Sequence, residues 1–269
     1  MSERAGGSAG RRPAAEDRRA GVRGWAALHA GVTPSATVRG WLAAVQRLAA
    51  LRPVARTPPD VLSAAGVAVA AAAALVAAAG GRWPLLTAVL VVLVGVLDGL
   101  DGAVALRTGR ARPLGAVVDA MADRVGDLLL AATLAVLGAP PTWCAAAAAL
   151  TLLHEYLRAR AGAAGMAGPG AVTVAERPTR LVLVAVAALG AGVLPAGTPW
   201  TGWAWATVCA IGWVAIGAVG LLHLAVAVAR QLPAHFPGDH GGPISPATIS
   251  ADSATSGSPP PGCADPPTR

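Results

Sequence analysis

Six long apolar stretches between residues 61 and 231 constrain this chain more than any other feature of its sequence. They cover residues 61–80, 84–106, 115–138, 141–162, 179–195 and 202–229. At a rise of ~1.5 Å per residue, helices of such lengths suit the ~30 Å hydrocarbon core of a bilayer. Charged residues make up only 13% of the chain, and its mean hydropathy is +0.58, which excludes most water-soluble enzymes. The sequence therefore predicts an all-α integral membrane protein with six transmembrane helices, because these stretches lack the alternation of barrel strands.

The arginine residues predict how these helices are oriented. All 21 basic residues are arginine, which excludes chemistry that needs a lysine nucleophile. Arginine-rich connections at 107–112 and 158–180 alternate with connections that hold one arginine or none, and ten arginines precede residue 61. Because positive residues favour the cytoplasmic side, both termini of this multi-pass cell-membrane protein are predicted in the cytoplasm. Tryptophans at the opposite helix ends agree with this orientation: Trp83, Trp143, Trp200, Trp203 and Trp205.

The segments that flank the apolar region differ from it in composition. Residues 1–35 are rich in Arg, Gly, Ala and Ser and predict a disordered basic arm, suited to anionic lipid headgroups rather than nucleic acid. Residues 36–55 predict an amphipathic juxtamembrane helix on the membrane surface, with a short soluble helix as the alternative. Residues 56–231 form the membrane domain, and the Pro-, Ser- and Gly-rich residues 232–269 predict a disordered tail.

Aspartates are concentrated in the most apolar part of the chain. Asp98 and Asp101 lie three residues apart near the end of the second stretch, and Asp119 and Asp123 lie four apart near the start of the third. Each pair shares a helix face, and the short connection makes the two helices antiparallel neighbours. Four converging carboxylates need a compensating cation in a low dielectric, and their oxygens favour Mg²⁺ or Mn²⁺, which suit phosphoryl transfer. The alternatives are ion pairs with nearby arginines or a proton relay in a transporter.

The aspartates belong to a longer pattern, Asp98-x-x-Asp101-Gly102-x-x-Ala105 followed by Gly115-x-x-x-Asp119-x-x-x-Asp123. This pattern resembles the signature of CDP-alcohol phosphatidyltransferases, and the resemblance covers roughly residues 55–230. It implies that 56–231 is a catalytic domain, that the four aspartates bind metal and that Asp123 is also the general base. It further implies transfer of a phosphatidyl group from a CDP-lipid, with release of CMP, in phospholipid biosynthesis, and a homodimer as the assembly.

The resemblance also implies a nucleotide site on the cytoplasmic side of the aspartates. Gly102 and Ala105 would line the nucleotide, and Asp60 and Ser63 are candidates to contact it; as an alternative, Asp60 is simply a helix cap. The family usually has arginine after the alanine of the motif, where this chain has Leu106. The arginines expected to meet the nucleotide phosphates in its place are Arg107, Arg110 and Arg112.

Polar residues near the end of the fourth stretch and the start of the fifth predict an acceptor site. Guanidinium groups bind phosphate with two parallel hydrogen bonds, and five arginines are candidates for the acceptor phosphate: Arg124, Arg158, Arg160, Arg177 and Arg180. The alternative is that they anchor the cytoplasmic side and pair with glutamates. These residues look like the branch that makes phosphatidylinositol phosphate, with phosphatidylglycerophosphate synthase as the alternative. We expect His154 to pack between helices rather than to act in catalysis.

Two further interpretations remain open from the sequence. The same aspartate cluster would suit a metal- or proton-coupled membrane transporter. The leucine at position 106 is also compatible with a family member that has lost its catalytic activity.

Overall fold

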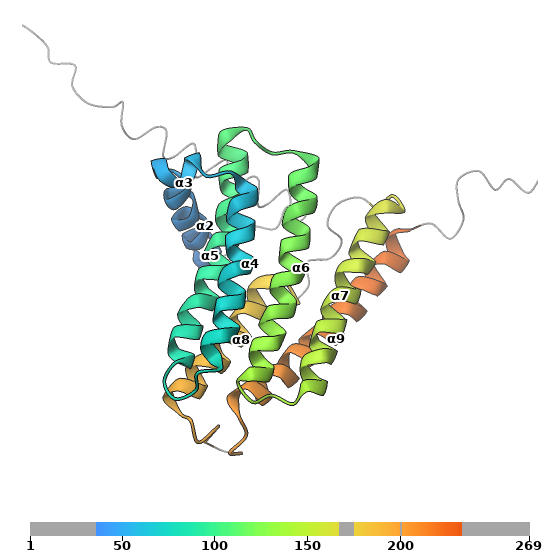
Figure 1. Ribbon diagram of the computed structural model, residues 1–269. Helices are drawn as coiled ribbons and strands as arrows, with labels where there is room; N and C mark the ends of the chain where they lie inside the picture. The colour runs from blue at the N-terminus through green and yellow to red at the C-terminus, as the bar shows by residue number, and fades with distance from the viewer. Residues whose placement is uncertain (1–35, 167–174, 200, 233–269) are drawn as a thin grey trace, which may run out of the picture. The chain divides into compact units, whose positions relative to one another are not determined.

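The computed structural model describes residues 36–166, 175–199 and 201–232, and within these ranges all regular structure is helical (Figure 1). Two short helices, α2 (Ala36–Ala49) and α3 (Arg52–Arg56), precede six long ones. The long helices are α4 (Pro59–Ala77), α5 (Pro84–Thr108), α6 (Pro113–Val136), α7 (Pro141–Ala163), α8 (Arg177–Val193) and α9 (Trp205–Gln231). The predicted basic arm, the predicted tail from residue 233 onward and Trp200 lie outside the described residues.

Proline fixes where most of the long helices begin. A proline stands in the first or second position of α4, α5, α6, α7 and α8, where its missing N–H would have no partner in the helix. At the other end of α5, Gly109 adopts a left-handed conformation with φ of 66°, which ends the helix and turns the chain toward α6. The six apolar stretches of the sequence are therefore helices, as predicted.

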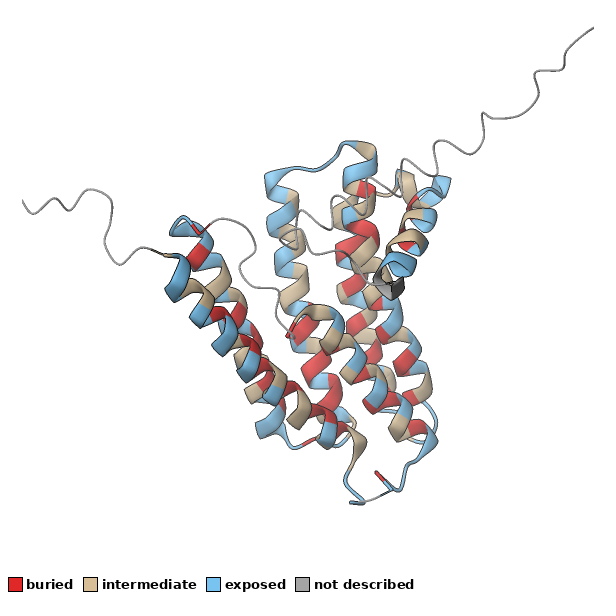
Figure 2. Ribbon diagram, turned by 180° about the vertical axis from the view of Figure 1, so that it is seen from behind, coloured by how far each residue is buried: buried red, intermediate tan, exposed pale blue. Residues whose placement is uncertain are grey.

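The long helices pack in a defined set of pairs. α4 lies against both α5 and α6, α5 also lies against α8, and α9 lies against α7 and α8. The buried side chains between them include Val91, Leu130, Leu134, Val184 and Trp213. Figure 2 shows that buried positions run along the sides of the helices that face their neighbours. Outward-facing apolar side chains, such as Val89 and Val92 of α5, remain exposed, which is typical of a surface that meets lipid.

Three of the described helices, α4, α5 and α9, are long and apolar enough to cross a membrane. α6 and α7 carry the aspartates, glutamate and arginines of the predicted site within their length, which lowers their mean hydropathy. α8 is shorter, with 17 residues. The structure thus gives an all-helical fold with three candidate membrane spans.

The predicted surface helix over residues 36–55 is divided in two. α2 ends at Ala49, and α3 follows after a short break. Val45 and Ala49 of α2 are buried in a small cluster with Leu62, Leu100 and Val104. Because Gly99 of α5 has no side chain, Val45 approaches its backbone closely: a Cβ on Gly99 would lie 3.2 Å from a Val45 methyl. α2 is therefore packed on α5 along part of its apolar face.

Candidate active site

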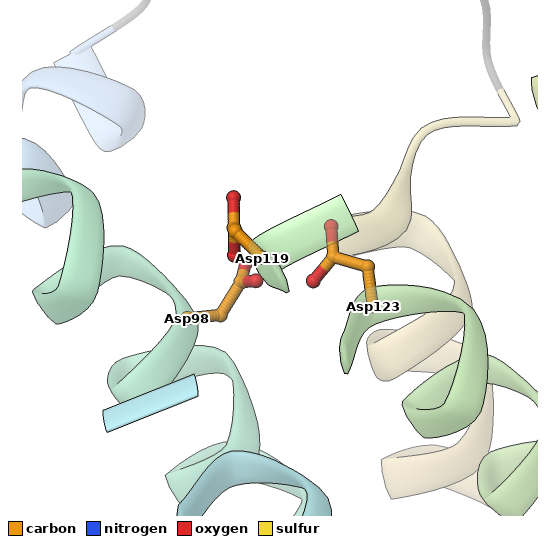
Figure 3. Close-up of side chains that lie close together, drawn as sticks. All are labelled: Asp98, Asp119 and Asp123. Carbon is orange, nitrogen blue, oxygen red and sulfur yellow. The ribbon is translucent and has the colours of Figure 1, made fainter. Parts of the chain in front are cut away.

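Three aspartates from two helices converge at one place. Asp98 of α5 and Asp119 and Asp123 of α6 point toward one another (Figure 3). Each offers a carboxylate oxygen, and these oxygens lie within 4.8 Å of one another. The convergence follows from helical spacing, because Asp119 and Asp123 are one turn apart and face the neighbouring helix together. Such a set of hard oxygen donors can hold a divalent cation.

Asp101, the fourth aspartate of the motif, lies one turn further along α5 and has a different partner. Its side chain is buried, and its Oδ2 accepts a hydrogen bond of 2.6 Å from the Ser63 hydroxyl of α4. Asp101 nevertheless lines the same small space as Asp98, Asp119 and Asp123. The structure therefore brings three carboxylates into direct proximity and holds the fourth beside them through α4.

An arginine reaches into the aspartate cluster from a third helix. Arg177, the first residue of α8, forms ion pairs with Asp123 and with Asp98, whose Oδ1 lies 3.3 Å from Arg177 Nη1. Gly126 of α6 leaves room for this side chain, since a Cβ there would lie 3.1 Å from Arg177 Nη2. The guanidinium supplies positive charge to carboxylates that would otherwise repel one another.

A larger pocket of about 220 Å³ opens beside Asp101 and Asp119. Most of the residues predicted to contact a nucleotide line it: Asp60, Ser63, Gly102, Ala105 and Arg112. Arg112 also forms an ion pair with Asp60, which joins the start of α6 to the start of α4. Carboxylates and guanidinium groups both line this pocket. The combination suits a phosphate group that contacts the arginines directly and the carboxylates through a cation.

The predicted contact residue Arg107 is not among the described residues that line this pocket. Leu106 and Arg110 line it instead. Leu106 is 71% exposed, and Arg110 follows the left-handed turn at Gly109, which returns the chain toward α3. There, Arg110 Nη1 donates a hydrogen bond of 3.4 Å to the carbonyl oxygen of Arg56. The glycine at position 109 was the sequence signal for this change of direction.

A second group of charges lies around Asp127, one turn beyond Asp123 on α6. Arg180 Nη1 lies 2.7 Å from Asp127 Oδ2, and Arg180 Nη2 lies 3.2 Å from Glu155 Oε1. Arg124 Nη1 lies 3.2 Å from the same Glu155 oxygen, and Arg124 Nη2 lies 3.6 Å from Asp127 Oδ2. The sequence predicts both arginines in an acceptor site, with pairing to glutamates as the alternative, and both do pair with Glu155. Asp127 lies one turn beyond Asp123, where the sequence predicts that it holds a ligand or an arginine, and it pairs with Arg180.

The remaining two candidates for the acceptor phosphate lie near the C-terminal end of α7. Arg158 Nη2 donates a hydrogen bond of 2.8 Å to Glu176 Oε1, the residue directly before α8. Arg160 is exposed near the C-terminal end of α7. His154 is buried between helices, and its Nδ1 lies 3.7 Å from Glu155 Oε1, which agrees with the expected packing role.

The chain is similar in sequence to known membrane enzymes of one family. Residues 56–214 match the family model of CDP-alcohol phosphatidyltransferase. The chain is 36% identical over 166 residues to phosphatidylinositol phosphate synthase of Mycolicibacterium smegmatis, which covers 56% of this chain and 72% of that protein. It is also 36% identical over 103 residues to archaetidylinositol phosphate synthase of Aeropyrum pernix, which covers 38% of this chain. The match spans about half the length of the Aeropyrum protein, 53%.

The fold also resembles a solved structure. Phosphatidylinositol phosphate synthase of Mycobacterium tuberculosis, in complex with manganese and citrate, superposes with a TM-score of 0.55. The two chains are 24% identical, and the match covers 72% of this chain and 90% of the other. This likeness supports the arrangement of the helices.

Proposed function

Because the chain belongs to the CDP-alcohol phosphatidyltransferase family, we propose that it transfers a phosphatidyl group from CDP-diacylglycerol to a phosphorylated polyol such as inositol phosphate. CMP is the second product. The observation that carries this proposal is the convergence of Asp98, Asp119 and Asp123 beside a pocket of about 220 Å³. The relatives named for phosphatidylinositol phosphate and archaetidylinositol phosphate synthesis support inositol phosphate as the acceptor.

The aspartate cluster fits a divalent cation by the chemistry of its donors. Asp98, Asp119 and Asp123 would hold Mg²⁺ or Mn²⁺ through carboxylate oxygens, with Asp101 as a further ligand one turn away. A bound cation of this kind stabilises the negative charge that develops on phosphate oxygens during transfer. Arg177 supplies one positive charge to Asp98 and Asp123, two of the same carboxylates.

Asp123 is the proposed general base. Its carboxylate removes the proton from the acceptor hydroxyl, whose oxygen forms a bond to the β-phosphorus of the CDP-lipid. The bond between that phosphorus and the CMP oxygen breaks, so that CMP carries away the electron pair. A carboxylate suits this role because it accepts the proton only as the nucleophile attacks.

The pocket beside Asp101 is the proposed nucleotide site. Gly102 and Ala105 offer a surface with little side chain, which lets a flat base or a phosphate approach α5. Ser63 and Asp60 line the wall formed by α4, and Arg112 and Arg110 supply positive charge near the diphosphate. Arg110 and Arg112 thereby supply the positive charge that, in the family motif, usually comes from an arginine at position 106.

Arg158, Arg160 and Arg177 are the proposed ligands of the acceptor phosphate. Arg177 reaches the carboxylates where the acceptor hydroxyl must arrive, and Arg158 lies at the same end of α7 as the exposed Arg160. Three guanidinium groups from two helices suit a dianionic phosphate monoester.

We also propose that α4–α9 all cross the membrane, with both termini in the cytoplasm and with 56–231 as the catalytic domain. The charged residues of α6–α8 are compatible with crossing because most of them form ion pairs with one another. The apolar part of α2 that remains exposed, including Trp41 and Leu48, suits contact with the cytoplasmic surface of the bilayer. A homodimer is the proposed assembly.

The experiment that tests the function is release of CMP from CDP-diacylglycerol by the purified protein in detergent with Mg²⁺. Inositol phosphate and glycerol phosphate are offered separately, and inositol without its phosphate is the control acceptor. Release with inositol phosphate alone supports the proposal, whereas release with glycerol phosphate alone identifies a phosphatidylglycerophosphate synthase.

If no acceptor gives CMP release while a related enzyme is active under the same conditions, the proposed function is wrong. Ion flux into proteoliposomes would then favour a transporter. Recovery of turnover in Leu106→Arg would favour a family member that has lost its activity at this position.

A further inference from the structure

A network of four charges, two of them buried and two half-buried, joins α6, α7 and α8 next to the aspartate cluster. Asp127 and Arg124 come from α6, Glu155 from α7 and Arg180 from α8. The two carboxylates and two guanidinium groups balance in charge, and adjacent members lie between 2.7 and 3.6 Å apart. The proposed mechanism gives Asp127 and Glu155 no chemical step, so their place in the fold needs another explanation.

Arg180 is the centre of this network and faces protein on every side. The residue is 2% exposed. Its Nη1 donates to Asp127, and its Nη2 lies within reach of Glu155. Its Nε and Nη2 both donate to the carbonyl oxygen of Ala175, at 3.0 and 2.8 Å. All three guanidinium nitrogens are thus engaged by protein groups, which leaves Arg180 poorly placed to receive a phosphate from solution.

The bonds to Ala175 give Arg180 a specific mechanical effect. Ala175 lies two residues before α8, and Arg177 is the first residue of that helix. By binding both the Ala175 carbonyl and Asp127, Arg180 fixes the entry of the chain into α8 against α6. Arg177 lies between Ala175 and Arg180 in the sequence, so the same contacts direct its side chain at Asp98 and Asp123.

We propose that Arg180 is a positioning residue that acts through Arg177. Held by Asp127 and Glu155, it sets where the Arg177 guanidinium meets the aspartate cluster. The inference rests on the proposed function in so far as Arg177 binds the acceptor phosphate. It divides the five arginines of this region into two kinds: Arg180 and Arg124 organise the site, and Arg158, Arg160 and Arg177 remain for the substrate.

A double-mutant cycle tests this inference. Arg180→Lys keeps a positive charge beside Asp127, so the protein is expected to fold. The variant loses the two guanidinium N–H groups that donate to the Ala175 carbonyl. The cycle combines it with Arg177→Ala, because two residues that act as one unit give effects that do not add. Thr151→Val is the matched control: it removes a buried hydrogen bond of α7 to Trp213, outside the network.

Two readouts are measured on each full-length variant in detergent. The first is the Michaelis constant for inositol phosphate, with that for CDP-diacylglycerol as the internal reference. The second is the dissociation constant for Mn²⁺ alone, followed by electron paramagnetic resonance, which requires no turnover. Because Arg177 shares carboxylates with the cation, its displacement is expected to tighten Mn²⁺ binding.

If Arg180 acts through Arg177, Arg180→Lys raises the Michaelis constant for inositol phosphate about tenfold and leaves that for CDP-diacylglycerol within about twofold. It also strengthens Mn²⁺ binding about fivefold. Both effects disappear in the Arg177→Ala background, and Thr151→Val shows neither.

If Arg180→Lys changes the constants equally in the wild-type and the Arg177→Ala backgrounds, Arg180 is a direct ligand, and the inference is overturned. Unchanged constants in the Arg180→Lys single variant would reduce it to a purely structural role and overturn the inference as well. If the wild-type protein releases no CMP, the proposed function fails, and the Mn²⁺ cycle still decides whether Arg180 acts through Arg177.

Discussion

Arg180 of α8 and Asp127 of α6 form a buried ion pair, with Nη1 and Oδ2 2.7 Å apart and neither residue more than 2% exposed. Removing two such charges from water is costly, and the cost is offset only when each finds several partners. Arg180 has Asp127, Glu155 and the Ala175 carbonyl. The pair therefore joins two helices at a place where the cluster of Asp98, Asp119 and Asp123 depends on their relative position.

Breaking this pair from the acidic side is expected to destabilise the protein strongly. Asp127→Asn leaves the Arg180 charge buried with a weaker set of partners, at a cost of about 3–5 kcal/mol. The matched control is Asp60→Asn, which removes the exposed ion pair with Arg112 and should cost at most about 1 kcal/mol. Thermal unfolding in detergent measures both. Similar melting temperatures for the two variants would show that the buried Arg180–Asp127 pair costs no more to break than the exposed pair.

Replacing the proposed base should remove turnover without removing the fold. Asp123→Asn keeps the size of the side chain but cannot accept the hydroxyl proton, and we expect the rate of CMP release to fall at least about 100-fold. Its Arg177 partner keeps a second carboxylate, Asp98, so that the melting temperature should change less than in Asp127→Asn. A folded Asp123→Asn protein with more than a tenth of wild-type activity would contradict the assignment of the base.

The departure at position 106 predicts which arginines serve the nucleotide. Arg112→Ala removes positive charge from the wall of the proposed nucleotide pocket and should raise the Michaelis constant for CDP-diacylglycerol about tenfold. Arg107→Ala should have a smaller effect, because Arg107 is not among the described lining residues. Adding Leu106→Arg to Arg112→Ala should restore part of the loss, since Leu106 lines the same pocket. Initial rates at varied CDP-diacylglycerol distinguish these cases, and a larger effect of Arg107→Ala would reverse the assignment.

Much of the fold follows from information that is local in the sequence. Apolar stretches, the prolines at the starts of five helices and the glycine after α5 define the six long helices to within three residues of the prediction. Helical spacing likewise predicted that Asp119 and Asp123 would face Asp98. The division of the surface helix after Ala49 was not predicted, although Pro53, in the first turn of α3, is a residue that commonly marks the start of a helix.

The partners of the charged residues could not be predicted in the same way. Asp101 accepts its hydrogen bond from Ser63, thirty-eight residues away on α4, and a motif within α5 and α6 contains no information on that contact. Arg110 lines the proposed nucleotide pocket because Gly109 reverses the chain direction, whereas the sequence alone offered Arg107, Arg110 and Arg112 alike. Arg180 meets Asp127 only once α8 has packed beside α6, so its role emerges from tertiary structure.

The contact between α8 and α5 supplies a prediction that is independent of catalysis. A Cβ on Gly192 of α8 would lie 2.7 Å from Leu85 Cγ, which is too close, and 3.2 Å from the Leu85 backbone nitrogen, which is tighter than an ordinary contact. Gly192→Ala should therefore push the helices apart and cost about 1–3 kcal/mol, more than the gain of up to about 1 kcal/mol from the higher helix propensity of alanine. At Gly162 of α7 the space around an added Cβ is open, so Gly162→Ala keeps only the propensity gain. Thermal unfolding should show a lower melting temperature for Gly192→Ala and an equal or higher one for Gly162→Ala. A higher melting temperature in both variants would mean that α5 and α8 are not in such close contact in the folded protein.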